Sequence, residues 1–419
     1  MMAVVLLAAL CATAVIGSVS VRHDIGRLRT SVAERAAVAD QLRFALSDLD
    51  AQRADTLAPG TVVVDATHSE IVGDEINALI TARQRRAQIS DLLRRLSADT
   101  AHATDLRAIF DALGRYDDIS GQASYVDDQD PVRPPGKPPA VAVSMNVQAG
   151  DVMTDTLLKD VDALSAGYQA QAGQLRDEAH DAARRWALAV GVLGTLTLLH
   201  LLRWQRELAR DYRRLLNPAL VAATAAVLAV ALAGGLALVS AAGTVSSASR
   251  EGLRPWNRLA EARAVAAQAA ATESRWFVHG SFAAQDEARF DAMTKELGVL
   301  LSPDGYAGAA ERPAYEDVLT RFGHFRADDR KLRAQQAAGD TEGAARTLTD
   351  VARGAVAFDF WDFATTLDGL AASRLDDFTR QVDDARGALD GWPAVPAGAL
   401  GAAAALVAVG LRRRYAEYR

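Results

Sequence analysis

One uncharged stretch, residues 215–249, decides the fold of this chain: LLNPALVAATAAVLAVALAGGLALVSAAGTVSSAS. A helix needs about 20 apolar residues to cross the hydrocarbon core of a bilayer. The stretch is longer than this minimum even if the helix begins at Pro218. A buried helix of a soluble protein rarely reaches such a length without a polar face. The stretch therefore predicts a membrane-spanning helix over residues 218–242.

Three further stretches lack Asp, Glu, Lys and Arg, and they cover residues 1–21, 186–202 and 391–411. The composition of the whole chain, with 50% hydrophobic and 24% charged residues, is near that of an ordinary soluble domain. The distribution of apolar residues is therefore more informative than their number. The alternative, four buried helices of a soluble core, fits the lengths poorly. We expect an all-α membrane protein with four transmembrane helices.

Basic residues predict the orientation of these helices. The short loop 203–217 contains five arginines, and the tail 412–419 begins with three more. Short loops rich in lysine and arginine stay in the cytoplasm. We therefore expect a multi-pass protein of the plasma membrane with both termini cytoplasmic. Two long segments, residues 22–185 and 243–390, then lie outside the cell.

The first apolar stretch has two interpretations. It lacks the basic residues that open a secretory signal peptide, so an uncleaved signal anchor is favoured over a cleaved signal. Its Cys11 is the only cysteine of the chain. The two outer segments therefore contain no disulfide, and helix packing alone has to hold them together.

Both outer segments have apolar residues at helical spacing. The pattern predicts four helices in each, over residues 24–57, 70–96, 105–124 and 148–185, and over residues 244–278, 285–301, 313–336 and 341–389. Antiparallel bundles bury such apolar stripes. We therefore expect two extracytoplasmic four-helix bundles, spanning residues 22–185 and 243–390.

Residues 127–139 interrupt the first bundle with five prolines. Proline cannot donate a backbone hydrogen bond and breaks helices. We expect a surface loop here, either a flexible insertion or a binding motif.

No catalytic signature occurs in the chain. No two of the seven histidines have the spacing of a zinc-binding helix, and no glycine-rich phosphate loop or nucleophile elbow is found. We expect no enzymatic activity, no catalytic residue, no metal and no cofactor. Because the predicted cytoplasmic parts are so short, any output has to act through a partner protein.

Three groups of residues are candidates for function. The loop arginines Arg203, Arg206, Arg210, Arg213 and Arg214 either set the topology and contact anionic lipid, or dock an acidic cytoplasmic partner. Glu273 and Arg275 are candidates for a sensory surface, against the simpler interpretation of solvated helix charges. An aromatic cluster favours core packing over a ligand pocket; its members are Phe358, Phe360, Trp361 and Phe363.

Several segments are similar to those of a known family. They are ALSDLDA at 45–51, TLAPG at 56–60, VMTDTLL at 152–158, ATES at 271–274 followed by VHG at 278–280, and residues 329–363. The plan resembles the four-helix-bundle sensor domains of bacterial chemoreceptors and histidine kinases. More closely, it resembles actinobacterial GlnX-like membrane proteins, which carry two such bundles in tandem.

The resemblance implies a function in signalling. It implies that the chain passes information from an extracytoplasmic amino-acid-binding protein of the GlnH type to a cytoplasmic Ser/Thr kinase of the protein kinase G type. A nucleic-acid partner is not expected. The alternatives are a direct small-molecule receptor, a membrane scaffold and, less favoured, a transporter component. A transporter fits poorly because both halves have the same orientation and their membrane helices carry few polar residues.

Overall fold

The computed structural model describes residues 2–27, 34–65, 68–130, 132–212, 218–280, 283–305 and 307–415. Nearly all of these residues are helical, and one two-stranded sheet is present among them. The chain divides into two compact units. The first, here called the apolar unit, comprises Met1–Ala33, Ala170–Gly252 and Asp376–Arg419. The second, here called the bundle unit, comprises Glu34–Gln169 and Leu253–Leu375.

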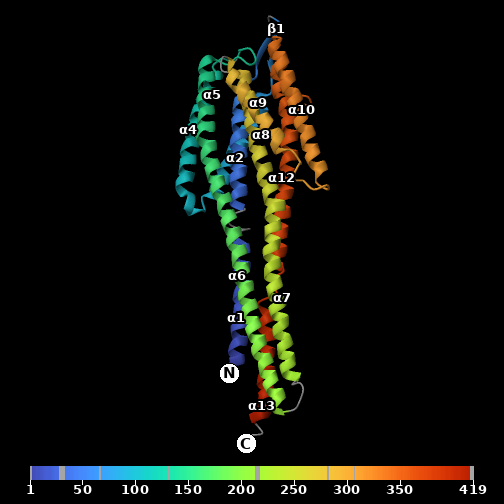
Figure 1. The fold of residues 1–419 in the computed structure, drawn as a ribbon. Coiled ribbons are helices and arrows are strands. Elements are labelled where there is room, and N and C mark those ends of the chain that lie inside the picture. The colour runs from blue at the N-terminus through green and yellow to red at the C-terminus, as the bar shows by residue number, and fades with distance from the viewer. Residues whose placement is uncertain are drawn as a thin grey trace. The chain divides into compact units, whose positions relative to one another are not determined.

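Four helices lie side by side in the apolar unit (Figure 1): α1 (Met2–Arg27), the later part of α6 (Leu158–Tyr212), α7 (Pro218–Ala248) and α13 (Ala394–Tyr415). Their shared core contains Leu10, Val190, Val227 and Leu400. Small residues bring the helices close together. A Cβ atom on Gly194 of α6 would lie 2.6 Å from the Cβ of Ala231 on α7.

Three helical runs among the described residues are long and apolar enough to cross a membrane. They are Met2–Arg27, Ala140–Glu207 and Pro218–Val278. Large apolar side chains such as Ile16, Leu188 and Leu236 are exposed on these runs, as expected of helices whose surroundings are hydrocarbon. These runs support a membrane protein with three candidate membrane-spanning helices. The apolar part of α13, Ala394–Ala408, is shorter, so the fourth span stays a prediction.

Nine α-helices lie wholly or mostly in the described part of the bundle unit, together with the start of α6. Those from the first outer segment are α2 (Glu34–Asp55), α3 (Glu75–Leu96), α4 (Ala103–Asp127), α5 (Ala140–Val152) and the start of α6. The second segment contributes α8 (Arg254–Val278), α9 (Ala283–Leu300), α10 (Arg312–Ala337), α11 (Thr341–Thr349) and most of α12 (Val356–Gly387), a helix that ends in the apolar unit.

The two outer segments share one hydrophobic core, whereas the sequence predicts two separate bundles. The core joins Leu46 and Tyr116 of the first segment to Val265 and Phe325 of the second. The reason lies in α2 and α8. Eight consecutive residues of α2, from Phe44 to Ala51, are buried, and so are the seven residues 269–275 of α8. Each helix is surrounded on all sides, and many of its contact residues are alanines, which permit close approach.

A β-hairpin stands where the sequence predicts the start of a helix at residue 70. Strand β1 (Gly60–Asp65) pairs antiparallel with β2 (His68–Val72). Gly73 follows with a φ of 96°, a left-handed conformation that favours glycine. Helix α3 then begins at Glu75, because the Asp74 side chain accepts a 2.9 Å hydrogen bond from the backbone N–H of Asn77.

Other helix boundaries also differ from the predicted ones. The predicted helix 341–389 is divided into α11 and α12, with Gly354 at a φ of 83° between them. Two single π-helical turns, η3 (Met153–Leu157) and η4 (Ser249–Leu253), join α5 to α6 and α7 to α8 without a break. A Cβ on Gly252 of η4 would lie 2.7 Å from the Cβ of Phe378, so η4 packs tightly on α12.

The proline-rich loop is an integral part of the bundle unit. The buried guanidinium group of Arg133 forms an ion pair with Asp127 and donates a 2.9 Å hydrogen bond to the carbonyl of Leu57. The backbone N–H of Thr61 in turn donates to the carbonyl of Arg133 over 2.7 Å. The described part of the loop therefore connects the hairpin to the end of α4. The loop is thus a packed part of the structure and not a flexible insertion.

Candidate functional site

An ion pair at the centre of the bundle unit joins the two outer segments. Asp50 of α2 accepts a hydrogen bond from Nη1 of Arg275 on α8, through its Oδ2 atom. Its Oδ1 atom accepts a 3.2 Å hydrogen bond from the Tyr116 hydroxyl of α4. Arg275 also donates from Nη2 to Thr272, over 3.2 Å. Asp50 and Arg275 are each only 4% exposed, so the pair lies in the interior.

Burial decides what this ion pair contributes. Removing water from two charges costs several kcal/mol, which their attraction offsets only in a well hydrogen-bonded arrangement. Loss of one partner leaves a stranded charge and costs about 3–5 kcal/mol. A pair of this kind adds little net stability, but it strongly disfavours any packing of α2 on α8 in which the two charges separate. Burial, and then the neighbouring charge of Asp50, raise the pKa of Tyr116 well above its usual value, so the hydroxyl stays a donor.

Glu273, next to this pair on α8, has no comparable partner. Its side chain is fully buried, and no N–H or hydroxyl group of the described residues donates to its carboxyl oxygens, whose hydrogen-bond partner is the carboxyl group of Asp329. Burial first, and then the charge of Asp329, raise the pKa of Glu273 well above its usual value. Arg333 opposes this shift, but its Nε atom is already hydrogen-bonded to Asp329 over 2.6 Å. Burial and the neighbouring charge of Asp329 therefore disfavour the charged form of Glu273.

Asp55, at the end of α2, titrates near neutrality. Burial raises its pKa to about 7, and the negative charge of Asp48 adds to the shift, while a hydrogen bond with Ser274 opposes it. Asp48 itself forms an ion pair with Arg85 of α3. The contact between α2 and α8 thus combines one compensated ion pair with two acids whose charged forms are disfavoured.

His279 closes the C-terminal end of α8. Its Nδ1 atom lies 2.7 Å from Oδ2 of Asp286 on α9, and its Nε2 atom lies 2.9 Å from Oδ1 of Asn146 on α5. The ring is buried. Both ring nitrogens thus face oxygen acceptors, and the imidazole ties three helices together.

A small polar cavity lies between these groups. Its volume is about 30 Å³, and it is lined by Val147, Gly150, Asp151, Arg275, His279, Gln285, Asp286 and Arg289. This space is enough for about one or two water molecules. Binding sites for small organic molecules have volumes of about 300–1,000 Å³. The cavity is therefore on the scale of bound water, and an amino acid does not fit it without rearrangement.

The two residues predicted for a sensory surface, Glu273 and Arg275, lie in the interior instead. Helical periodicity places a charged residue on the solvent side of an amphipathic helix, but α8 has no solvent side over residues 269–275. The structure brings Arg275 to Asp50, and Glu273 close to Asp329. Their assignment to a surface is thus corrected, while a role in sensing stays a prediction.

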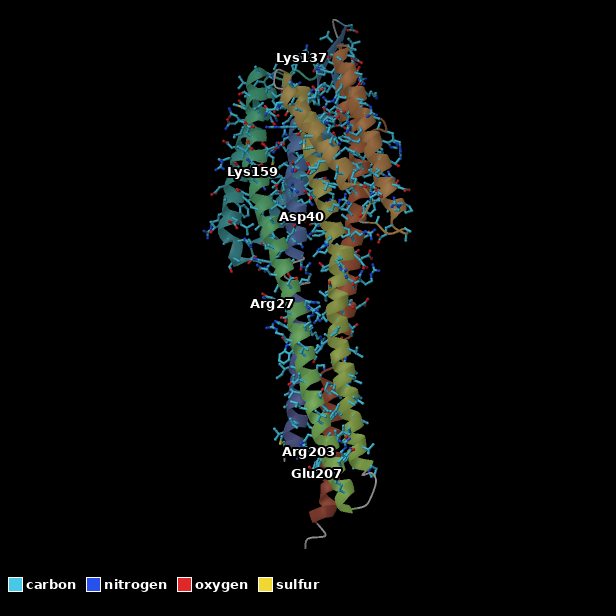
Figure 2. The ribbon with its side chains drawn as sticks, viewed as in Figure 1. Arg27, Asp40, Lys137, Lys159, Arg203 and Glu207 are labelled. Carbon is cyan, nitrogen blue, oxygen red and sulfur yellow. The ribbon has the colours of Figure 1, made fainter. Side chains whose placement is uncertain are left out.

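The loop arginines belong to the apolar unit, whereas the network belongs to the bundle unit. Arg203, Arg206 and Arg210 are exposed, and Figure 2 shows Arg203 beside Glu207 near the end of α6. The two side chains form an ion pair of 3.1 Å. The other two candidates, Arg213 and Arg214, lie outside the described residues. Docking of an acidic partner by these arginines stays a prediction.

The aromatic cluster separates into two pairs. Phe363 is buried and Phe360 packs against the core, where they contact Phe322 and Phe325 with ring centroids 5.3 and 5.5 Å apart. Trp361 is 58% exposed and lies against Phe358. Core packing therefore accounts for one half of the cluster.

Two members of the network, Asp50 and Tyr116, are absent from the candidate functional residues of the sequence analysis, although Asp50 lies in the segment 45–51 that carries the family resemblance. Both leave a weak signal: Asp50 continues the stripe of Leu42 and Leu46 in steps of four residues, and Tyr116 continues that of Ile109 and Leu113. A polar residue on an apolar stripe points to a buried polar contact, but it does not identify the partner.

Known proteins give no further guidance, since no family model, no curated protein and no solved structure matches the chain.

Proposed function

We propose that the chain is a transmembrane signal relay without enzymatic activity, with four membrane spans and both termini in the cytoplasm. The observation that carries the proposal is the buried ion pair between Asp50 and Arg275. It joins the first helices of the two outer segments, and it is bordered by acids whose ionisation is disfavoured. Such a contact favours one register of α2 on α8 and penalises the others.

The helix that carries Arg275 is also part of a candidate membrane span. Helices α7 and α8 form one uninterrupted run, Pro218–Val278, through the π-helical turn η4. A small rotation or translation of α8 would therefore be transmitted along the same helix to its apolar part. Helix shifts of about 1–2 Å are a common form of signalling movement.

The input partner in this proposal is an extracytoplasmic solute-binding protein of the GlnH type, and the output partner is a cytoplasmic Ser/Thr kinase of the protein kinase G type. Both come from the family resemblance. The small size of the cavity beside Arg275 supports a delivered signal over direct binding of an amino acid. The exposed arginines after the second span supply a basic surface for the output partner.

The experiment that tests this proposal is a pull-down from crosslinked cells, with an affinity tag on the C-terminal tail and mass spectrometry of the recovered proteins. We expect a solute-binding protein and a kinase with the wild type. The Arg275→Gln variant should recover them in altered amounts, whereas the exposed Arg330→Gln variant should behave as the wild type. Recovery of neither partner with the wild type would exclude the relay.

A further inference from the structure

An open basic pocket lies in the apolar unit, at the C-terminal end of α1. Its volume is about 380 Å³, and it is lined by Val19, Arg22, His23, Gly26, Arg27 and Arg386. Four of these six residues are basic and none is acidic. Arg27, labelled in Figure 2, belongs to this set.

The pocket lies at the level where the apolar part of α1 ends. Val21 is the last residue of the uncharged run, and Arg22 is the first charged residue. Polar and charged side chains that flank a membrane span lie among the lipid headgroups. The pocket therefore opens at the depth where lipid phosphates are found.

One face of α1 leads from hydrocarbon to this pocket. Ile16 and Val19 are exposed, and they precede His23 and Arg27 at helical spacings of three and four residues. Residues at this spacing share a helix face. A lipid whose acyl chain lies along Ile16 and Val19 would have its headgroup beside the basic side chains of the pocket.

Two arginines of the pocket, Arg22 and Arg27, already have interaction partners. Arg22 forms an ion pair with Asp390, 2.5 Å long. The side chain of Arg386 takes part in none of the ion pairs between described residues. Arginine matches the geometry of a phosphate, because its planar guanidinium group donates two parallel hydrogen bonds.

We propose that this pocket binds the phosphate of an anionic phospholipid, with the acyl chain on the exposed Ile16 and Val19 face. The inference is independent of the proposed relay, since it rests on the apolar unit alone. A free phosphate has the same headgroup chemistry, but only a lipid accounts for the apolar face that continues into the pocket.

The test measures lipid binding to the purified full-length chain. The chain, delipidated in detergent, is titrated with phosphatidylglycerol or with phosphatidylcholine, and native mass spectrometry counts the bound lipids. The Arg27→Gln/Arg386→Gln variant removes two charges from the pocket. Its matched control, Arg184→Gln/Arg185→Gln, removes two exposed charges from α6 that do not line the pocket.

We expect the wild type to prefer phosphatidylglycerol. Each basic residue near anionic lipid contributes about 1 kcal/mol, or roughly a fivefold change in affinity. The pocket variant should therefore bind phosphatidylglycerol about 25-fold more weakly, and the control should retain the affinity. If the pocket variant does not fold, His23→Glu, which places a negative charge at an exposed position of the same pocket, should weaken binding in its place.

Three results would overturn the proposal. Equal loss of binding in the control would show a non-specific basic surface. Displacement of the lipid by millimolar inorganic phosphate would assign the pocket to a free anion. Equal binding of phosphatidylcholine by the wild type would show that charge plays no part.

Discussion

The apolar unit and the bundle unit both pack long helices side by side, but they bury different kinds of polar side chain. In the described part of the apolar unit, the buried polar side chains are hydroxyls: Ser18 and Thr197 donate to carbonyls of their own helices over 2.9 and 2.7 Å, and Ser249 accepts a 3.5 Å hydrogen bond from Arg176 of α6. In the bundle unit, the most deeply buried helices carry Asp50, Glu273 and Arg275. A helix in lipid has to satisfy its own backbone groups and rarely carries a charge in its apolar part, whereas a helix in the bundle unit can bury a charge that pairs with a partner on another helix. Charge therefore specifies packing in one unit, and shape does so in the other.

The largest effect should follow from breaking the central ion pair. The Asp50→Ala substitution leaves Arg275 buried without its partner, and we expect a loss of about 3–5 kcal/mol in the free energy of unfolding. Thermal or denaturant unfolding of the full-length chain in detergent measures it. The matched control is Asp50→Leu/Arg275→Met, which removes both charges and should be far less harmful. A double variant as unstable as the single one would argue against a stranded charge.

The buried acids of the bundle unit should make the stability of the protein depend on pH. Burial raises the pKa of Asp55 to about 7 and that of Asp40 to about 6, from 3.8 in the unfolded chain. The folded state therefore binds more protons than the unfolded state between about pH 4 and pH 7. Stability should rise as the pH falls from 8 toward 5, and the melting temperature should increase by several degrees.

The matched variant for this prediction is Asp55→Asn, which cannot ionise. It should flatten the pH dependence between pH 8 and pH 5, and its difference from the wild type should grow as the pH falls below about 7. A variant that keeps the full pH dependence of the wild type would show that the effect has another origin.

Packing in the apolar unit should be sensitive to shape. Gly194→Ala places a Cβ only 2.6 Å from the Cβ of Ala231, so α6 and α7 have to separate. Overpacking of this kind costs about 1–3 kcal/mol. Gly191→Ala on the same helix meets nothing within 4 Å and serves as the control. Unfolding in detergent compares the two, and equal stability would contradict the close contact of α6 with α7.

The smallest effect should come from the exposed ion pair of Arg203 with Glu207. Pairs four residues apart on a helix surface contribute about 0.3–0.5 kcal/mol. We expect Arg203→Gln to change the free energy of unfolding by no more than this amount, and Glu207→Gln to have an effect of the same size. A loss above 1 kcal/mol would indicate a structural role that the exposure of Arg203 does not explain.

The sequence predicts the apolar unit better than the bundle unit, for a physical reason. Long uncharged stretches identify membrane-spanning helices directly, since a bilayer imposes both their length and their composition. An apolar or helical pattern does not show which other helices of the chain a given helix packs against. Nothing local in residues 44–51 or 269–275 distinguishes a helix buried on one side from a helix buried on all sides.

The candidate site shows the same limit. Periodicity selects Glu273 and Arg275 as charged positions, but the partner of Arg275 is Asp50, 225 positions earlier in the chain. The sequence does not indicate the β-hairpin for a related reason: Ile71 lies eight residues before Leu79, a spacing that also suits a helix, and the helical pattern is broken only by the left-handed conformation of Gly73. Contacts between distant segments and single backbone conformations therefore require the structure.

The most direct test of the central claim compares signalling in the wild type and in an Asp50→Asn variant. The kinase recovered on the tagged chain is quantified by mass spectrometry, in cells with ample amino acids and in cells deprived of them. Both proteins must first be shown to be inserted and folded to the same extent. If the ion pair between α2 and α8 sets the signalling state, recovery changes with amino-acid supply in the wild type and stays at one level in Asp50→Asn. A variant that responds as the wild type does would contradict this role of the ion pair.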